Sequence, residues 1–360
     1  MKRALLIVAI VAIQFVLFET ALRLFGHSEA SPSFQALFIP DSTIGYRLRP
    51  NARTRFVTAE FDTEIAINAQ GVRDDRDIGP KAPNERRIVV LGDSLVLSVQ
   101  VDVRQTFCRL LEERLNARSG PIHYRVINAG VQGYGPVEEL LFYRKIARAF
   151  QPDLVIETIF VGNDAEEAAA SEPRLRGASG PAADDGAGSL TSRFRRLVRR
   201  SMVLQVLRLR VVSVTDRLPQ WGAPPEPPLQ SYAERLAARV IDGLRISHDC
   251  VLEIANDAAA SGARTMVMLM PARFQVDDAD YLRLKAAVEG TGGHLVRDAA
   301  TARFAAVLAP MPIPLFDALP ALKAALPGPD VFFQQTVHLT PRGHQIVAQA
   351  LETFLKQQGL

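Results

Sequence analysis

The sequence is poor in cysteine and tryptophan, and each shortage excludes a class of protein. Its 360 residues include one tryptophan and two cysteines, Cys108 and Cys250. Two cysteines do not form the disulfide framework of a small secreted domain, and no CxxC or clustered His/Cys pattern indicates a metal site. Both cysteines lie among apolar neighbours in helical patterns. We interpret them as buried small hydrophobic residues, with a disulfide between them left open.

Net charge is also low, at +3, and no stripe of lysine and arginine with interleaved aromatic residues is present. We therefore expect no nucleic-acid partner. Charged residues make up 22% and hydrophobic residues 48% of the chain, which is typical of a globular protein that carries one apolar segment. No motif indicates a cofactor, and we expect none.

One long apolar run is present, at the amino terminus. Lys2 and Arg3 precede an apolar stretch over residues 4–18, and Glu19 and Arg23 lie near its far end. A positive start followed by about 20 apolar residues predicts a transmembrane signal-anchor over residues 1–26, and a cleaved signal is the alternative. By the positive-inside rule the rest of the chain is exported, so we expect an inner-membrane protein with its main domain in the periplasm or outside.

Two further regions follow the predicted anchor. Within residues 36–80, residues 56–68 alternate roughly and residues 68–71 form a turn signal, which predicts a small β-rich appendage. Residues 85–360 form the main domain, with a variable insertion at about 165–230. Within the insertion, residues 165–190 are rich in Ala, Gly, Ser and Pro and predict a mobile loop. The basic stretch 193–210 is compatible with a packed helix, a lid or a contact with anionic lipid.

The main domain alternates between strand and helix patterns. Apolar, largely β-branched runs predict strands over residues 88–91, 124–129, 154–161, 264–270 and 313–316. Helical spacing separates them, and Thr340-Pro341 begins a last helix. This order predicts an α/β fold with three layers and a flavodoxin-like parallel sheet.

Four polar motifs punctuate this pattern, three at the carboxyl ends of predicted strands and one before the last helix. They are Gly92-Asp93-Ser94, Asn128-Ala-Gly-Val-Gln-Gly133, Gly162-Asn163-Asp164 and His338-Leu-Thr-Pro-Arg-Gly-His344. Parallel strands end at one edge of a sheet, so we expect the first three motifs to meet in space. Ester hydrolysis requires a hydroxyl nucleophile, a base and fixed donors for the oxyanion, and these motifs offer all three.

With these four blocks in this order, the sequence resembles the SGNH, or GDSL-type, hydrolase family. The Gly-x-Ser-x-Gly elbow of classical α/β-hydrolases is absent. The resemblance implies that Ser94 is the nucleophile and His338 the general base. It implies an oxyanion hole made by the N–H groups of Ser94 and Gly133 and the amide of Asn163. Asp93 would support the nucleophile from behind, and we interpret His344 as structural.

The sequence departs from the family pattern at the acid of the triad. That acid normally lies two or three residues before the histidine, where this chain has Thr336 and Gln335. Gln335 through its side chain, a backbone carbonyl, or Asp330 folding back are three alternatives for orienting His338. Loss of catalysis is a fourth.

These features predict a serine esterase that hydrolyses carboxylic esters by a Ser-His mechanism. The envelope location and the resemblance favour O-acetyl groups on a glycan, so the expected partners are an acylated small molecule or glycan ester and the membrane. An O-acyltransferase acting on polysaccharide and an inactive glycan-binding or scaffold protein are the alternatives.

Overall fold

The computed structural model describes residues 14–15, 32–117, 120–177, 229–290, 292–326 and 330–359. The predicted anchor over residues 1–26, apart from Gln14 and Phe15, lies outside these ranges, as do the basic stretch 193–210 and most of the predicted insertion. Within these ranges, no helix combines the length and the hydrophobicity needed to cross a bilayer.

The centre of the fold is a five-stranded parallel sheet. Its strands are β5 (Glu85–Gly92), β6 (His123–Gly130), β7 (Leu154–Phe160), β8 (Arg264–Met270) and β9 (Leu315–Asp317), in the spatial order β6-β5-β7-β8-β9. This is the doubly wound order in which the first strand lies between the second and the third. The structure therefore confirms the predicted α/β fold with a flavodoxin-like sheet.

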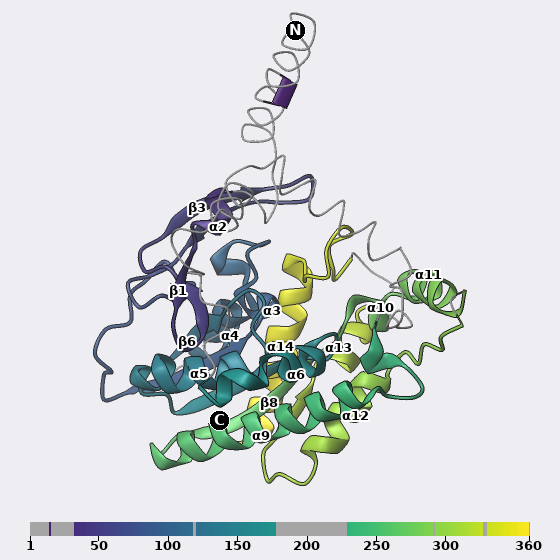
Figure 1. Cartoon of the computed structure of the whole chain (residues 1–360). Helices are drawn as coiled ribbons and strands as arrows, with labels where there is room; N and C mark the ends of the chain where they lie inside the picture. Colours follow the sequence, from purple (N-terminus) through teal and green to yellow (C-terminus); the bar gives the residue numbers. More distant parts are fainter. Residues whose placement is uncertain are drawn as a thin grey trace, which may run out of the picture.

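Helices cover both faces of the sheet (Figure 1). Ile88 and Val90 of β5 share a hydrophobic core with α4 and α14 on one face, whereas Val89 and Leu91 share a core with α5 and part of α9 on the other. Because side chains alternate along a strand, residues 88–91 contribute side chains to the cores on both faces of the sheet. The helices are α3 (Ser94–Leu97), η1 (Val103–Gln105), α4 (Phe107–Asn116), α5 (Pro136–Lys145), η2 (Ala147–Phe150), α6 (Asp164–Leu175), η3 (Gln230–Tyr232), α9 (Ala238–Ala260), α10 (Arg273–Val276), α11 (Asp278–Glu289), α12 (Ala299–Leu308), α13 (Leu319–Ala324) and α14 (Pro341–Gln357).

The predicted mobile loop over residues 165–190 is wrong in its first part. Residues 164–175 form the helix α6, which packs against α9. Ala165 and Ala168 are buried on one side of this helix, and at Gly243 of α9 an added Cβ would lie 1.7 Å from the carbonyl oxygen of Ala165. The small residues that suggested a loop instead allow two helices to approach closely.

The appendage consists of a short helix and two antiparallel hairpins. The helix α2 (Pro32–Gln35) precedes the hairpin of β1 (Phe38–Asp41) and β2 (Gly45–Leu48) and the hairpin of β3 (Arg53–Val57) and β4 (Asp62–Ala66). Leu48, Phe56 and Ile65 of these hairpins belong to the same core as Val89 and Leu91 of β5. The appendage is therefore packed on the main domain.

Arg73, just after the hairpins, ties the appendage to the segment that follows Ser94. Its guanidinium is buried and donates hydrogen bonds to the carbonyl groups of Leu97, Ser98 and Val101. Burial lowers the pKa of Arg73 to about 10. Three carbonyl partners compensate for the loss of water around this cation.

Candidate active site

Ser94 lies where β5 ends and α3 begins. Gly92, the last residue of β5, has φ +154°, and an added Cβ would lie 2.3 Å from a methyl group of Val96. The strand can turn sharply into the helix because this position carries no side chain. The Asp93 carboxylate accepts a hydrogen bond from the Leu95 N–H at 2.8 Å and caps α3. Ser94 is half-buried, and its Oγ lies 3.5 Å from Asp93 Oδ2.

Gly133 follows the neighbouring strand β6, whose end pairs with that of β5 through Gly92 and Gly130. Gly133 has φ +69° and is exposed. The preceding carbonyl, of Gln132, accepts a hydrogen bond at 2.7 Å from the hydroxyl of Tyr46 in β2. The appendage therefore holds this loop in place, a contact that nothing in the sequence motif indicated.

Asn163 follows β7, the strand on the other side of β5. Its side-chain Nδ2 donates a hydrogen bond to Glu167 Oε1 at 2.7 Å, while its Oδ1 is buried without a partner within the described residues. One N–H of the amide is thus occupied by Glu167. Sequence reasoning missed Glu167, although its position four residues after Asn163 on a helix places the two side chains on one face.

His338 lies in a tight loop before α14. The loop is closed by the Phe333 N–H donating to the His338 carbonyl at 2.9 Å and by the Thr340 N–H donating to the Val331 carbonyl at 3.0 Å. The imidazole is 6% exposed, and neither ring nitrogen has a hydrogen-bond partner within the described residues. Burial lowers the pKa of His338 to about 4, so the ring is neutral at pH 7.

The structure brings neither proposed orienter to the His338 ring. The Asp330 carboxylate accepts a hydrogen bond from the Gln334 side chain at 2.5 Å, and the backbone N–H of Gln335 is bonded to Glu60. Ser94 Oγ and the imidazole are also not hydrogen-bonded to each other. The loop that carries His338 is thus held by hydrogen bonds to its backbone, while the imidazole ring makes no hydrogen bond within the described residues.

Glu60, in the turn between β3 and β4, is the residue that holds this loop. Its Oε1 accepts from the Gln334 N–H at 2.7 Å and its Oε2 from the Gln335 N–H at 2.8 Å. Beside it, the rings of Phe61 and Phe333 lie 5.3 Å apart. Sequence analysis missed both contacts because they join segments more than 270 residues apart in the chain.

His344, the other histidine of the last motif, is buried in the packing between α14 and α4. Its ring stacks on Phe107 with centroids 5.9 Å apart, and its Nδ1 accepts a hydrogen bond from the Phe107 N–H at 3.2 Å. Burial lowers its pKa to about 3. These contacts support the structural role expected for His344. Cys108 and Cys250 are likewise buried, and both are free thiols.

A group of buried carboxyl groups surrounds Asp93, and sequence reasoning did not identify it. Burial raises the pKa of Asp93 to about 6, that of Glu157 in β7 to about 7 and that of Glu167 to about 8. The pKa values of Glu139 and Asp164 lie well above their ordinary values, first through burial and then through neighbouring carboxylates. A glutamate inside the apolar run of residues 154–160 was the one sequence signal that pointed to this group.

The geometry therefore gathers three of the predicted site residues at one edge of the sheet. Ser94, Gly133 and Asn163 follow the carboxyl ends of β5, β6 and β7, which are adjacent strands. A hydroxyl with backbone and amide N–H donors beside it is suited to bind and attack a carbonyl group. Where His338 acts relative to Ser94 remains a prediction.

No family model and no curated protein matches this chain. Solved structures with a similar fold include TesA, at 16% identity and a TM-score of 0.42 over 76% of this chain and 99% of that one. They also include a protein of the G-D-S-L family from Desulfitobacterium hafniense DCB-2, at 10% identity and a TM-score of 0.39, which covers 74% of this chain and 98% of that one. The esterase EstA from Pseudoalteromonas sp. has 11% identity and a TM-score of 0.42, covering 76% and 98%.

Proposed function

We propose that this chain is a serine esterase of the SGNH type, which hydrolyses carboxylic esters through Ser94. The observation that carries this proposal is the position of Ser94, Gly133 and Asn163 at the ends of three adjacent strands. Each residue supplies a part that acyl transfer needs, and each part comes from a different loop. The parallel topology brings the three loops to one edge, and the residue types at their turns are those that acyl transfer uses.

In the proposed mechanism, the neutral His338 takes the proton of Ser94 as the Oγ attacks the ester carbonyl. The oxyanion that forms accepts hydrogen bonds from the N–H groups of Ser94 and Gly133 and from the Asn163 amide. His338 then protonates the leaving alcohol, and water releases the acyl group by the reverse steps. The hydrogen bond between Ser94 and His338 would form when substrate is bound, because such bonds are often long or misaligned in a free enzyme.

The expected substrate is an O-acetyl ester on an envelope glycan. This part of the proposal follows from the predicted amino-terminal anchor over residues 1–26, which would hold residues 85–360 outside the inner membrane. If a sugar hydroxyl takes the place of water, the same residues would perform O-acyl transfer to polysaccharide.

Hydrolysis of p-nitrophenyl acetate by the full chain, with Ser94→Ala as the control, tests the proposal. We expect turnover in the parent chain and a loss of at least a thousandfold in the variant, since Ser94 forms the covalent intermediate. Equal rates in the two proteins would refute the esterase function.

A non-catalytic glycan-binding protein is the second candidate, because the ring nitrogens of His338 have no partner within the described residues. It predicts that a serine-directed phosphonate does not label Ser94. Mass spectrometry of the treated protein separates the two candidates, since an active nucleophile would carry the phosphonyl group on the peptide that contains Ser94.

A further inference from the structure

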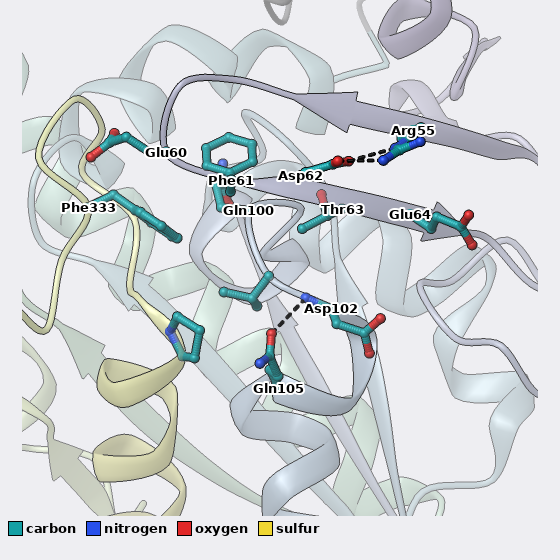
Figure 2. Close-up of a pocket in the computed structure, with 12 residues that line it drawn as sticks. Arg55, Glu60, Phe61, Asp62, Thr63, Glu64, Gln100, Asp102, Gln105 and Phe333 are labelled. Carbon is teal, nitrogen blue, oxygen red and sulfur yellow. Dashed lines mark hydrogen bonds and ion pairs between the residues drawn. The ribbon is translucent and has the colours of Figure 1, made fainter.

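A groove of about 510 Å³ lies between the β3–β4 hairpin and the loop that carries His338 (Figure 2). One wall is the hairpin, with Glu60 and Phe61 at its turn. The opposite wall includes Phe333 and Pro341, and the floor is formed by residues 100–102 with Gln105. This volume is in the range of sites that bind small molecules or one part of a larger ligand.

The floor of the groove holds an unsatisfied amide, that of Gln100. The residue is 2% exposed, and neither its Oε1 nor its Nε2 has a hydrogen-bond partner within the described residues. In Figure 2 the amide lies behind the ring of Phe61. A buried amide without partners costs free energy, and a ligand that offers both a donor and an acceptor would recover it. A hydroxyl group offers both.

The carboxylates of the groove are mostly engaged by the protein itself. Glu60 accepts from the backbone of residues 334 and 335, and Asp62 pairs with Arg55 at 2.6 Å. Asp102 accepts from the Arg104 N–H at 2.8 Å. An anionic ligand would meet four carboxylates, Glu64 included, against the single guanidinium of Arg55, so this groove disfavours negative charge.

Two aromatic rings add an apolar surface to these polar groups. Phe61 and Phe333 lie 5.3 Å apart, from opposite walls of the groove. An aromatic surface next to a neutral amide suits a ligand with both C–H faces and hydroxyl groups. Sugar rings combine the two.

We propose that this groove binds a neutral sugar unit of the ester substrate and discriminates against acidic sugars. The proposal rests on the proposed esterase function, of which it names the alcohol part. Gln100 would pair with the sugar hydroxyls and Phe61 with a sugar face. Because the β3–β4 hairpin builds one wall, the appendage would contribute to substrate choice.

Binding of two sugar hexamers to the full chain tests the proposal. We expect xylohexaose, which is neutral, to bind at least tenfold more tightly than hexagalacturonic acid by isothermal titration calorimetry. The buffer contains no glycosidic detergent, because such detergents would compete. Gln100→Met keeps the length of the side chain and removes both hydrogen-bonding atoms, so we expect it to weaken xylohexaose binding about tenfold.

Two further variants make the test specific. Gln345→Met makes the same chemical change on an exposed position of α14, outside the groove, and should leave binding unchanged. Glu64→Lys should raise the affinity for hexagalacturonic acid and so reduce the discrimination. Midpoints of thermal unfolding establish that each variant is folded.

The proposal is overturned if xylohexaose does not bind, if the acidic hexamer binds equally well, or if Gln100→Met binds like the parent chain. None of these measurements requires ester hydrolysis. Failure of the groove proposal is therefore distinguishable from failure of the esterase proposal, which the p-nitrophenyl acetate assay decides.

Discussion

Glu60 and Gln335 are joined by a hydrogen bond of 2.8 Å across 275 positions of the sequence. The same carboxylate accepts the N–H of Gln334, so a single side chain in the appendage holds the turn that leads to His338. Gln335 is one of the two positions, with Thr336, at which the resembled family carries its acid. In this chain the carboxylate of Glu60, from the β3–β4 hairpin, contacts Gln335, but it accepts a hydrogen bond from the backbone N–H of that residue.

The first prediction concerns Glu60 as a positioning residue. Glu60→Ala removes two charge-assisted hydrogen bonds, so the histidine loop should sample other positions, and we expect kcat for p-nitrophenyl acetate to fall about tenfold to a hundredfold. KM should change less than twofold, since this small ester leaves the groove empty. Glu60→Gln keeps one acceptor oxygen and should recover part of the rate. Glu113→Ala, on the exposed side of α4, is the matched control, and a parent-like kcat in Glu60→Ala would contradict the role.

The second prediction concerns the turn at Gly133. An added Cβ would lie 3.0 Å from the Tyr46 hydroxyl, and φ +69° is strained for any residue with a side chain. Gly133→Ala should lower kcat at least tenfold because the N–H that we propose for the oxyanion hole would shift, at a cost in stability of about 1 kcal/mol. Gly262→Ala is the matched control, since Gly262 has φ +79° with open space around it. It should lose similar stability and keep its rate, as urea unfolding and steady-state kinetics would show.

The third prediction concerns the pH dependence of the rate. A general base must be neutral, and burial lowers the pKa of His338 to about 4. The acid limb of kcat/KM should therefore fall near pH 4, well below the ordinary histidine value of about 6.5. Measurement of kcat/KM from pH 3.5 to 8 with a neutral ester checks this. An inflection near pH 6.5 would mean that the imidazole is solvated in the free enzyme.

The fourth prediction concerns the buried carboxyl groups. Burial raises the pKa of Glu157 to about 7 in the folded chain. The folded chain is therefore more stable when this carboxyl group is protonated than when it is charged. This contribution is fully present below the unfolded pKa of about 4.5 and is lost as the pH rises through 7. From Glu157 alone we expect the free energy of unfolding to decrease by on the order of 2 kcal/mol between pH 5 and pH 8, and the raised pKa values of Asp93 and Glu167 add to this decrease.

Glu157→Gln should make this pH dependence shallower, because an amide does not titrate, while Asp93 and Glu167 still contribute. Its free energy of unfolding in urea should therefore exceed that of the parent chain at pH 8. Glu113→Gln provides the same chemical change on an exposed position and should leave the profile unchanged. Identical slopes for Glu157→Gln and the parent chain would argue against a raised pKa at this residue.

The sheet was predictable from the sequence because its signals are local. The apolar runs that became β5, β6 and β7 end in polar motifs, and parallel strands bring those ends to one edge. Ser94, Gly133 and Asn163 could be placed in this way. The start of α14 at Thr340 was also predictable, since this threonine caps the helix through its own hydroxyl.

The partners of these residues could not be predicted, because each depends on packing between distant segments. Tyr46 reaches Gln132, and Glu60 reaches Gln335, from hairpins whose position over the sheet no local pattern specifies. The helix α6 occupies the first part of the predicted loop over residues 165–190, and it was missed for the same reason. Its alanines are explained only by the glycine of α9 that packs against them.

The buried guanidinium of Arg73 has a consequence for how this chain can be shortened or recombined. Arg73 precedes the first strand of the main sheet, and its guanidinium donates hydrogen bonds to three backbone carbonyls that follow Ser94. A fragment that starts at residue 85 would lose this guanidinium, and the carbonyls of Leu97 and Val101 would lose the side-chain donor that it supplies. The segment that contains the hairpins and Arg73 is therefore needed for the conformation of the loop after Ser94. A chimaera that exchanges only the first 80 residues must keep an arginine at position 73.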